Sequence, residues 1–209
     1  MRKYEDLKIY LLDNREDMCN AWKAALNEAE DYHQNVEVIH SDFRDFMKKE
    51  SQRIDSVVSP ANSYGLMDGG YDAALTMWYG TELQDAVQKE IIDRYFGEQP
   101  VGTCMSVFIP TAYGQYLLHT PTMRVPSIIK EPEIVYHCTR ACIMEALRLE
   151  VNNIVIPAFG GCCGKVPDKL IADYMERALY SFENIPNNLS WHWAYKISSL
   201  GEMNPKERN

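Results

Sequence analysis

The sequence contains no apolar run of the roughly 18 residues that a membrane-spanning helix requires. Positive charge is also scarce, since 21 Lys and Arg against 30 Asp and Glu give a formal net charge of −9. Binding to a nucleic-acid backbone depends on clustered Lys and Arg, so this balance argues against nucleic acid as a partner. The charged N-terminal residues are not followed by an apolar signal region. We therefore expect a soluble, cytoplasmic protein with no membrane partner.

The six cysteines form no Cys-x-x-Cys pair and show no spacing typical of a zinc site. His137, Cys138 and Cys142 could share one helix face, but no fourth ligand is evident beside them. We expect reduced thiols, no metal and no cofactor. Two nucleotide-binding motifs are also missing: the Gly-Lys-Ser/Thr ending of a P-loop and the dinucleotide fingerprint after the first strand. ATP hydrolysis and hydride transfer therefore lack their usual motifs.

The chain has 209 residues, 46% of them hydrophobic and 24% charged, which fits one large globular domain. We assign residues 1–200 to that domain and residues 201–209 to a polar C-terminal tail.

Short apolar runs alternate with segments of helical periodicity along the chain. The expected strands are residues 7–12, 36–40, 54–58, 102–110, 116–120, 153–158 and 191–197. The expected helices are residues 15–30, 43–50, one from Asp72, one from Thr81 with a capping box, 132–150 and 168–182. This alternation predicts an α/β fold of three layers, α/β/α, around a mixed sheet that is mostly parallel. We expect the strands at 102–110 and 116–120 to be antiparallel neighbours.

Two glycine-rich loops each follow an apolar strand and lead into a helix. The first contains Gly69 and Gly70, and the second contains Gly160, Gly161 and Gly164. Glycine lets a ligand approach the backbone closely, and the N–H groups at a helix N-terminus attract anions. Ligands of such sheets bind beyond the carboxyl ends of the strands, so we expect both loops to share one crevice. The alternative is that each loop is only a tight turn.

Five segments, in order, resemble the macro domain, a family of ADP-ribose-binding modules and ADP-ribose-processing enzymes. In that family a Gly-Asp-Ile/Val segment precedes Asn-Ala-Ala-Asn-Ser, a glycine loop with Val-Asp-x-Ala-Ile, a Tyr-Ile-Ile-His-Thr strand and a second glycine-rich loop. The corresponding segments here are residues 41–43 (Ser-Asp-Phe), 59–63 (Ser-Pro-Ala-Asn-Ser), 68–75 (Asp-Gly-Gly-Tyr-Asp-Ala-Ala-Leu), 116–120 (Tyr-Leu-Leu-His-Thr) and 156–164 (Ile-Pro-Ala-Phe-Gly-Gly-Cys-Cys-Gly).

The resemblance implies an ADP-ribose site with a role for each segment. Asp42 would accept a hydrogen bond from the adenine amino group, and Asn62 would bind the distal ribose beside the acid Asp72. Main-chain N–H groups of residues 161–164 would hold the diphosphate. The implied ligand-binding residues are Asp42, Phe43, Ser59, Asn62, Gly69, Gly70, Asp72, Phe159, Gly160, Gly161, Cys162, Cys163 and Gly164, with Asp72 and Asn62 as the catalytic pair.

Each of these assignments has a plainer alternative. Asp42 could be a helix cap, and Asp72 could be a first-turn acid favoured by the helix dipole. Cys162 and Cys163 could act as nucleophiles, but small residues in a tight loop are the better interpretation because no His is near them in sequence.

This chain also departs from the family pattern. Ser59 replaces the first Asn of Asn-Ala-Ala-Asn, and Cys163 stands where the family usually has an aromatic residue. Adenine stacking would need an aromatic residue from elsewhere, and Trp193 and Tyr195 on the expected last strand are candidates for it.

We therefore expect a protein that binds ADP-ribose or a related adenine nucleotide between the two glycine loops. Hydrolysis at the distal ribose is one possible activity, either removing ADP-ribose from a modified protein partner or phosphate from ADP-ribose phosphate. The alternatives are a binding module without catalysis and a structural protein with a degenerate pocket.

Overall fold

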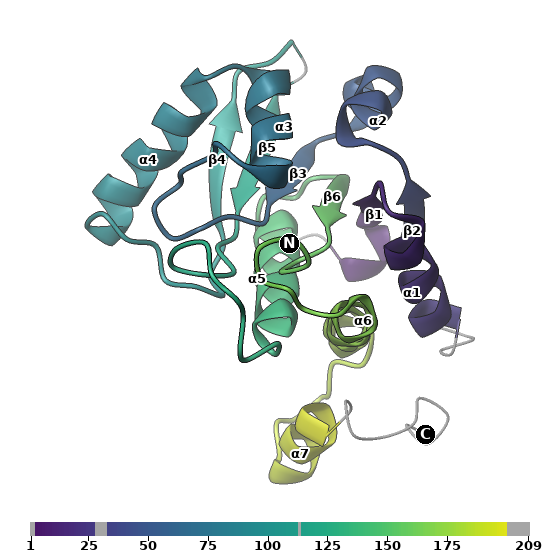
Figure 1. Cartoon of the computed structure of the whole chain (residues 1–209). Helices are drawn as coiled ribbons and strands as arrows, with labels where there is room; N and C mark the ends of the chain where they lie inside the picture. Colours follow the sequence, from purple (N-terminus) through teal and green to yellow (C-terminus); the bar gives the residue numbers. More distant parts are fainter. Residues whose placement is uncertain (1–2, 28–32, 113, 200–209) are drawn as a thin grey trace.

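The computed structural model describes residues 3–27, 33–112 and 114–199. A six-stranded sheet runs through the molecule, and helices pack on both of its faces (Figure 1). The strands are β1 (Lys8–Asp13), β2 (Val36–His40), β3 (Ser56–Ser59), β4 (Met105–Ile109), β5 (Gln115–His119) and β6 (Asn153–Pro157). The α-helices are α1 (Glu16–Asn27), α2 (Phe43–Glu50), α3 (Gly70–Tyr79), α4 (Glu82–Tyr95), α5 (Ile134–Arg148), α6 (Asp168–Glu183) and α7 (Trp191–Ser199).

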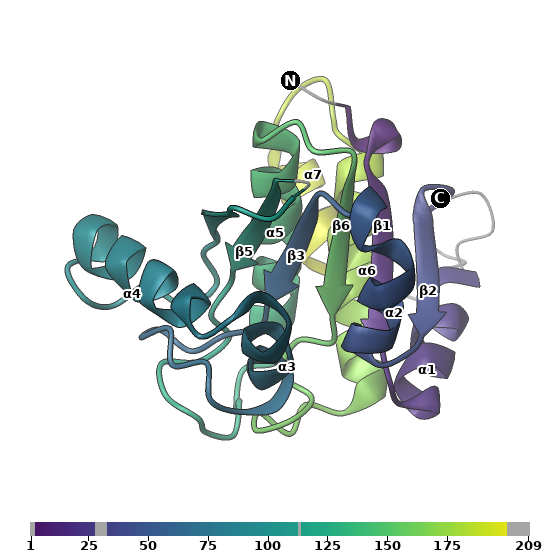
Figure 2. The same cartoon turned by 90° about the horizontal axis from the view of Figure 1, so that it is seen from above.

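The sheet has the strand order β2-β1-β6-β3-β5-β4 and is mostly parallel. Only β4 and β5 pair antiparallel, with Met105 opposite His119, which confirms the expected antiparallel pair. Every residue of β3 and β6 is buried, as expected for parallel strands covered by helices on both faces. The labelled parallel strands in Figure 2 run in the same direction, so their carboxyl ends meet at one edge of the sheet.

Alternating strand residues feed two hydrophobic cores, one on each face of the sheet. Val58 and Leu118 point into the core formed with α1, α5 and α6. Val57 and Leu117 point to the opposite face, where α2, α3 and α4 cover them. This arrangement confirms the expected three-layer α/β/α fold (Figure 2).

The prediction of a last strand at residues 191–197 is wrong, because this segment is helix α7. β1 fills the position between β2 and β6, and β3 fills the other side of β6, so both edges of β6 are occupied. Residues 191–199 instead begin a helix after Ser190, whose hydroxyl accepts a hydrogen bond from the Trp193 N–H at 3.1 Å. In Figure 1, α7 lies beyond α6, away from the sheet.

Other boundaries follow the sequence closely. The bounds of β2 and α2 agree with those expected, and Asp42 is the N-cap of α2. Thr81 precedes α4 but makes no side-chain capping hydrogen bond, so the expected capping box is absent there. The expected tail at residues 201–209 lies outside the described residues.

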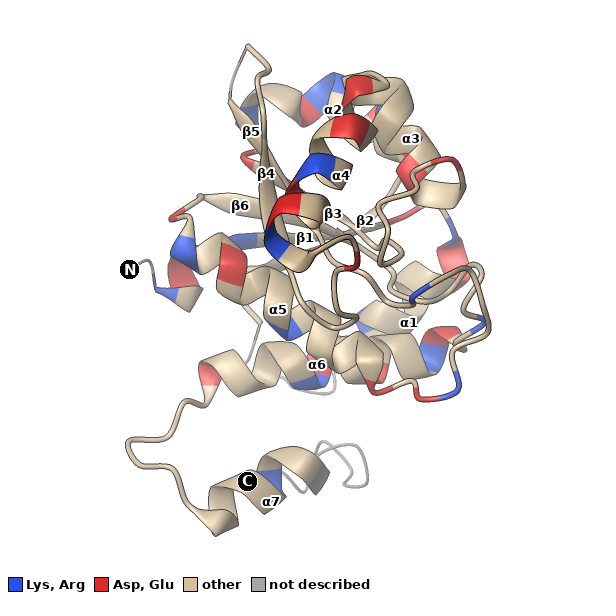
Figure 3. Ribbon diagram, turned by 90° about the vertical axis from the view of Figure 1, so that its left-hand side faces the viewer, with Lys and Arg blue, Asp and Glu red and all other residues tan. Residues whose placement is uncertain are grey.

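Within the described ranges, no helix is long and apolar enough to cross a membrane. Figure 3 shows Lys and Arg interspersed with Asp and Glu over the helices in that view.

Candidate functional site

A cleft of about 590 Å³ lies at the carboxyl ends of the parallel strands. Residues at or beyond the ends of five strands line it: 12–15 at the end of β1, 41–43 after β2, several between 60 and 74 after β3, several between 122 and 126 after β5, and 157, 158 and 160–164 at the end of β6. This position is the one that the strand direction of an open α/β sheet predicts. Both glycine loops therefore contribute to one crevice, as expected from the sequence.

The first glycine loop delivers the N-terminus of α3 to the cleft. Gly69 is the N-cap and makes no side-chain capping hydrogen bond, so N–H groups in the first turn of α3 have no side-chain cap there. Gly70 has a φ of +56°, a conformation that favours glycine. A β-carbon added to Gly69 would have no neighbouring atom within 4 Å, which leaves room for a ligand against the backbone.

The second glycine loop is held in a tight shape by packing. A β-carbon on Gly164 would lie 2.5 Å from the carbonyl oxygen of Gly160 and 2.6 Å from the side chain of Ile129. The Ile129 N–H donates to the Gly164 carbonyl at 2.9 Å, and the Val166 N–H donates to that of Gly160 at 3.1 Å. Neither of these two bonds uses an N–H group of residues 161–164.

The two loops approach each other at the cleft. A β-carbon placed on Gly70 would lie 4.0 Å from Sγ of Cys162. The uncapped end of α3 and the backbone of the second loop therefore face the same space. Such a concentration of main-chain N–H groups is suited to binding an anion.

Asp72 lies in the first turn of α3 and lines the cleft. Its side chain is buried, and Oδ1 accepts a hydrogen bond of 2.6 Å from the hydroxyl of Ser59. Burial raises the pKa of the Asp72 carboxyl to about 6; the Ser59 hydrogen bond opposes this rise and the charge of Asp68 adds to it. Asp72 is therefore a buried acid whose charge state changes near neutral pH.

Asn62 shapes the first loop through its side-chain amide. Nδ2 donates to the carbonyl of Leu66 at 2.7 Å. Oδ1 accepts the N–H groups of Tyr64 at 3.1 Å and Leu66 at 3.3 Å. One Nδ2 hydrogen remains for a ligand, because the amide has two donors.

Asp42 and Phe43 line the cleft at the end of β2. Oδ1 of Asp42 accepts the N–H of Arg44 at 2.9 Å, so the capping role proposed as the plainer alternative is present. Its side chain is 41% exposed, which leaves it accessible from the cleft. The Phe43 ring packs edge-on against Tyr71, another lining residue, with their centroids 5.3 Å apart.

Most residues implied by the family resemblance come together here. Two of them, Ser59 and Phe159, are fully buried and do not line the cleft; Ser59 reaches it only through its bond to Asp72. The lining residues from that set are Asp42, Phe43, Asn62, Gly69, Gly70, Asp72, Gly160, Gly161, Cys162, Cys163 and Gly164. The stacking candidates Trp193 and Tyr195 belong to α7 and are not among the lining residues.

Asp13, Asn14 and Arg15 also line the cleft, and the sequence motifs did not indicate them. A usable signal was present, because these residues come directly after the apolar strand at residues 7–12. The rule that ligands bind beyond the strand ends applies to them as well as to the glycine loops. That signal alone did not show that the end of β1 lies beside the glycine loops, because this depends on the position of β1 between β2 and β6 in the sheet.

The cysteines do not form an activated nucleophile or a metal site within the described part of the chain. Cys162 and Cys163 are exposed, and the neighbouring thiol of Cys162 raises the pKa of Cys163, which disfavours its thiolate. Cys138 and Cys142 are fully buried, and burial raises the pKa of both thiols. No group of three or more His, Cys, Asp or Glu side chains among these residues could hold a metal ion.

His119 lies within the strand expected at 116–120 and is the last residue of β5, where it is a buried structural residue. Its Nδ1 lies 2.6 Å from Oε1 of Gln99, and burial lowers its pKa to about 3. It is therefore uncharged at neutral pH, and it does not line the cleft.

Comparisons with known proteins agree with this architecture. The family model described as Macro domain matches residues 58–175. An uncharacterized protein of Aquifex aeolicus (strain VF5) is 32% identical over 130 residues, which cover 62% of this chain and 74% of that protein.

Two solved structures show the same fold. A macrodomain of Oceanobacillus iheyensis with ADP aligns at a TM-score of 0.55 and 19% identity, over 73% of this chain and 83% of that one. A Trypanosoma brucei macrodomain in complex with ADP-ribose aligns at a TM-score of 0.51 and 21% identity, over 62% of this chain and 52% of that one.

Proposed function

The chain belongs to the macro domain family, and from the geometry of its cleft we propose that it binds ADP-ribose or a related adenine nucleotide. The observation that supports this most strongly is the meeting of two glycine loops at Gly70 and Cys162. Main-chain N–H groups there can attract the anionic diphosphate although the protein carries a net negative charge, because local dipoles act on a bound anion at close range.

The strand order gives the ligand a direction across the cleft. The ends of β2, β1, β6 and β3 follow one another at about 4.8 Å, so the ends of β2 and β3 are roughly 14 Å apart. In our proposal the adenine lies near Asp42 after β2, and the diphosphate lies on the second glycine loop after β6. The distal ribose then lies near Asp72 and Asn62 after β3.

Titration calorimetry with free ADP-ribose tests the site as a whole. We expect one site per chain and a rise in thermal stability at saturating ligand. Absence of both heat and thermal shift at millimolar ADP-ribose would favour the structural alternative with a degenerate pocket.

The adenine contact is tested at Asp42. Asp42→Asn keeps an oxygen that can cap α2 but removes the charge that would receive the adenine amino group. A hydrogen bond to a charged group contributes about 1.5–3 kcal/mol, so we expect adenine-containing ligands to bind about ten- to a hundredfold more weakly. Ribose phosphate should bind unchanged. Equal losses for both ligands would assign Asp42 to the cap alone.

We propose further that Asp72 supports hydrolysis at the distal ribose. A carboxyl with a pKa of about 6 is mostly ionised at neutral pH, and such a base is well matched to accept a proton from water. No described residue hydrogen-bonds to its Oδ2, and Asn62 would help to hold the ribose. The substrate would be a protein carrying ADP-ribose or the phosphate ester of ADP-ribose.

A non-catalytic binding module is the second candidate. It is favoured by the local engagement of the Asn62 amide, which makes three hydrogen bonds within its own loop. Asp72→Ala separates the two candidates: hydrolysis should fall by about 10²–10⁴ while ADP-ribose still binds. If the wild-type protein binds ADP-ribose but releases neither ADP-ribose from a modified protein nor phosphate from ADP-ribose phosphate, the binding module is the function.

The organisation of residues 1–200 as one domain and the cytoplasmic location stay predictions from the sequence.

A further inference from the structure

Arg15 is the only lysine or arginine among the described residues that line the cleft. The charged residues around it are four aspartates, Asp13, Asp42, Asp68 and Asp72. A ligand with a diphosphate therefore meets carboxylates over much of this surface. Its anionic part is best accommodated where Arg15 and the main-chain N–H groups coincide.

Two carboxylates hold the guanidinium of Arg15 in place. Its Nε lies 3.2 Å from Oδ1 of Asp13, and one terminal nitrogen lies 3.4 Å from Oδ2 of the same residue. The other terminal nitrogen donates to Oδ1 of Asp168 at 2.8 Å. These contacts use three of the five N–H donors of a guanidinium, so one donor on each terminal nitrogen remains.

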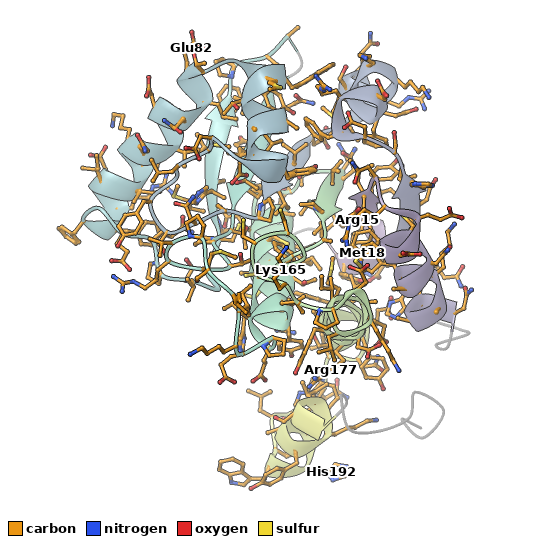
Figure 4. The ribbon with its side chains drawn as sticks, viewed as in Figure 1. Arg15, Met18, Glu82, Lys165, Arg177 and His192 are labelled. Atoms are coloured by element: carbon orange, nitrogen blue, oxygen red, sulfur yellow. The ribbon has the colours of Figure 1, made fainter. Side chains whose placement is uncertain are left out.

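The free edge of this group lies beside the second glycine loop. A β-carbon on Gly161 would lie 3.1 Å from a terminal nitrogen of Arg15. Figure 4 labels both Arg15 and Lys165, which belongs to this loop. The Arg15 side chain is 44% exposed, so a ligand on the loop can reach it. Arginine is well suited to this position because its planar group binds phosphate oxygens through paired N–H donors.

We propose that Arg15 binds the diphosphate of the ligand and thereby fixes the position of that group on the second glycine loop. This inference rests on the proposed function, but Arg15 lies outside residues 58–175, which the family model matches. The residue reaches the cleft because β1 lies next to β6 in the sheet. Asp13 and Asp168 already compensate its charge, so its contribution is mainly directional hydrogen bonding.

The competing interpretation is structural. Through Asp168, Arg15 ties the start of α1 to the start of α6. A purely structural role predicts that its loss affects the stability of the fold and every ligand alike. A ligand contact predicts that only ligands with phosphate lose affinity.

The test compares wild type with Arg15→Gln by calorimetry, using ADP-ribose, inorganic pyrophosphate and adenosine. We expect about a ten- to hundredfold weaker affinity for ADP-ribose and pyrophosphate, as for the loss of one charge-assisted hydrogen bond, and no change for adenosine. Arg148→Gln removes a surface arginine that pairs with Glu145, and it should change none of the three affinities. Equal affinity of wild type and Arg15→Gln for ADP-ribose, or an equal loss for adenosine, overturns the inference.

Asp168→Asn provides a second variant if Arg15→Gln does not fold. It keeps an oxygen that can accept from Arg15 and removes one of the two carboxylate charges that compensate the guanidinium, so pyrophosphate should bind severalfold more tightly. Unchanged or weaker pyrophosphate binding in this variant contradicts the inference.

The pyrophosphate arm also separates the two proposals. Wild type could bind pyrophosphate but not ADP-ribose, with pyrophosphate binding lost in Arg15→Gln. In that case the proposed function fails and the role of Arg15 stands. If neither compound binds to wild type, both proposals fail.

Discussion

The hydroxyl of Ser59, in the last position of β3, donates a 2.6 Å hydrogen bond to Oδ1 of Asp72 in the first turn of α3. Ser59 is fully buried, so this bond has no competition from solvent. It orients the carboxyl and stabilises its charged form, while burial acts in the opposite direction. The serine that replaces the family's asparagine thus does not line the cleft and acts on the buried acid instead.

Ser59→Ala should raise the pKa of Asp72 above about 6, because it removes the one hydrogen bond that favours the carboxylate. NMR titration of the Asp72 carboxyl carbon measures this directly. Ser59→Thr keeps the hydroxyl and serves as the matched control. An unchanged pKa in Ser59→Ala would mean that the hydrogen bond does not control the ionisation of the acid.

Asp72→Asn should stabilise the fold at pH 8 and have much less effect at pH 4. The folded-state pKa of about 6 lies above the ordinary value of 3.8, so ionisation of Asp72 costs stability as the pH rises through this range. The gain in unfolding free energy at pH 8 should be up to about 3 kcal/mol. Urea unfolding at both pH values gives this difference. If Asp72→Asn changes the unfolding free energy equally at both pH values, the raised pKa of Asp72 is contradicted.

Two glycine substitutions should separate packing from ligand access. Gly164→Ala places a methyl group against the Gly160 carbonyl and Ile129, and the strain should lower stability by roughly 1–3 kcal/mol. Gly69→Ala meets no atom within 4 Å and should leave the melting temperature nearly unchanged. It should nevertheless weaken ADP-ribose binding, because the methyl group occupies space beside the uncapped end of α3. Unaltered affinity in Gly69→Ala would place the ligand elsewhere.

His33 should make stability fall at alkaline pH. Its ring nitrogens lie 3.3 Å from Glu176 and 3.2 Å from Glu183. Burial lowers the pKa of His33, but the hydrogen bonds to the two glutamates outweigh it and raise the pKa to about 9. The stabilisation that charged His33 gains from the two glutamates is therefore fully present below pH 6.5 and is lost as the pH rises through 9.

His33→Gln tests this effect. The difference in unfolding free energy between wild type and variant should shrink by up to about 3 kcal/mol from pH 6 to pH 10. His137→Gln replaces an exposed histidine and is the control. A difference between wild type and His33→Gln that does not change with pH would show that His33 is not charged in the folded protein.

Local signals were sufficient for most elements of the fold. Asp42 before an amphipathic segment predicted α2 with the bounds that the structure has, and β-branched runs predicted β2 and β6. The glycine loops were recognisable because each follows an apolar strand and leads into a helix. These features depend on residues close together in the sequence.

The missed features depend on strand order. The segment at 191–197 has the aromatic residues of a strand, but β1 already occupies the interior position beside β6. The same order brings Arg15 to the second glycine loop, a contact between residues that are far apart in the sequence. The Ser59 to Asp72 bond likewise follows from how α3 turns back over β3.

The placement of β1 also affects how the protein is made. Lys8 pairs with Asn153, so β1 gains its second neighbour only after most of the chain has been synthesised. At about 5–20 residues per second, this interval is roughly 7–30 s. β1 and its parallel neighbour β2 are synthesised early, but the other edge of β1 has no neighbour until β6 is synthesised. The nascent chain therefore has a strand edge exposed to unwanted pairing for longer than a fold in which neighbouring strands follow one another in sequence.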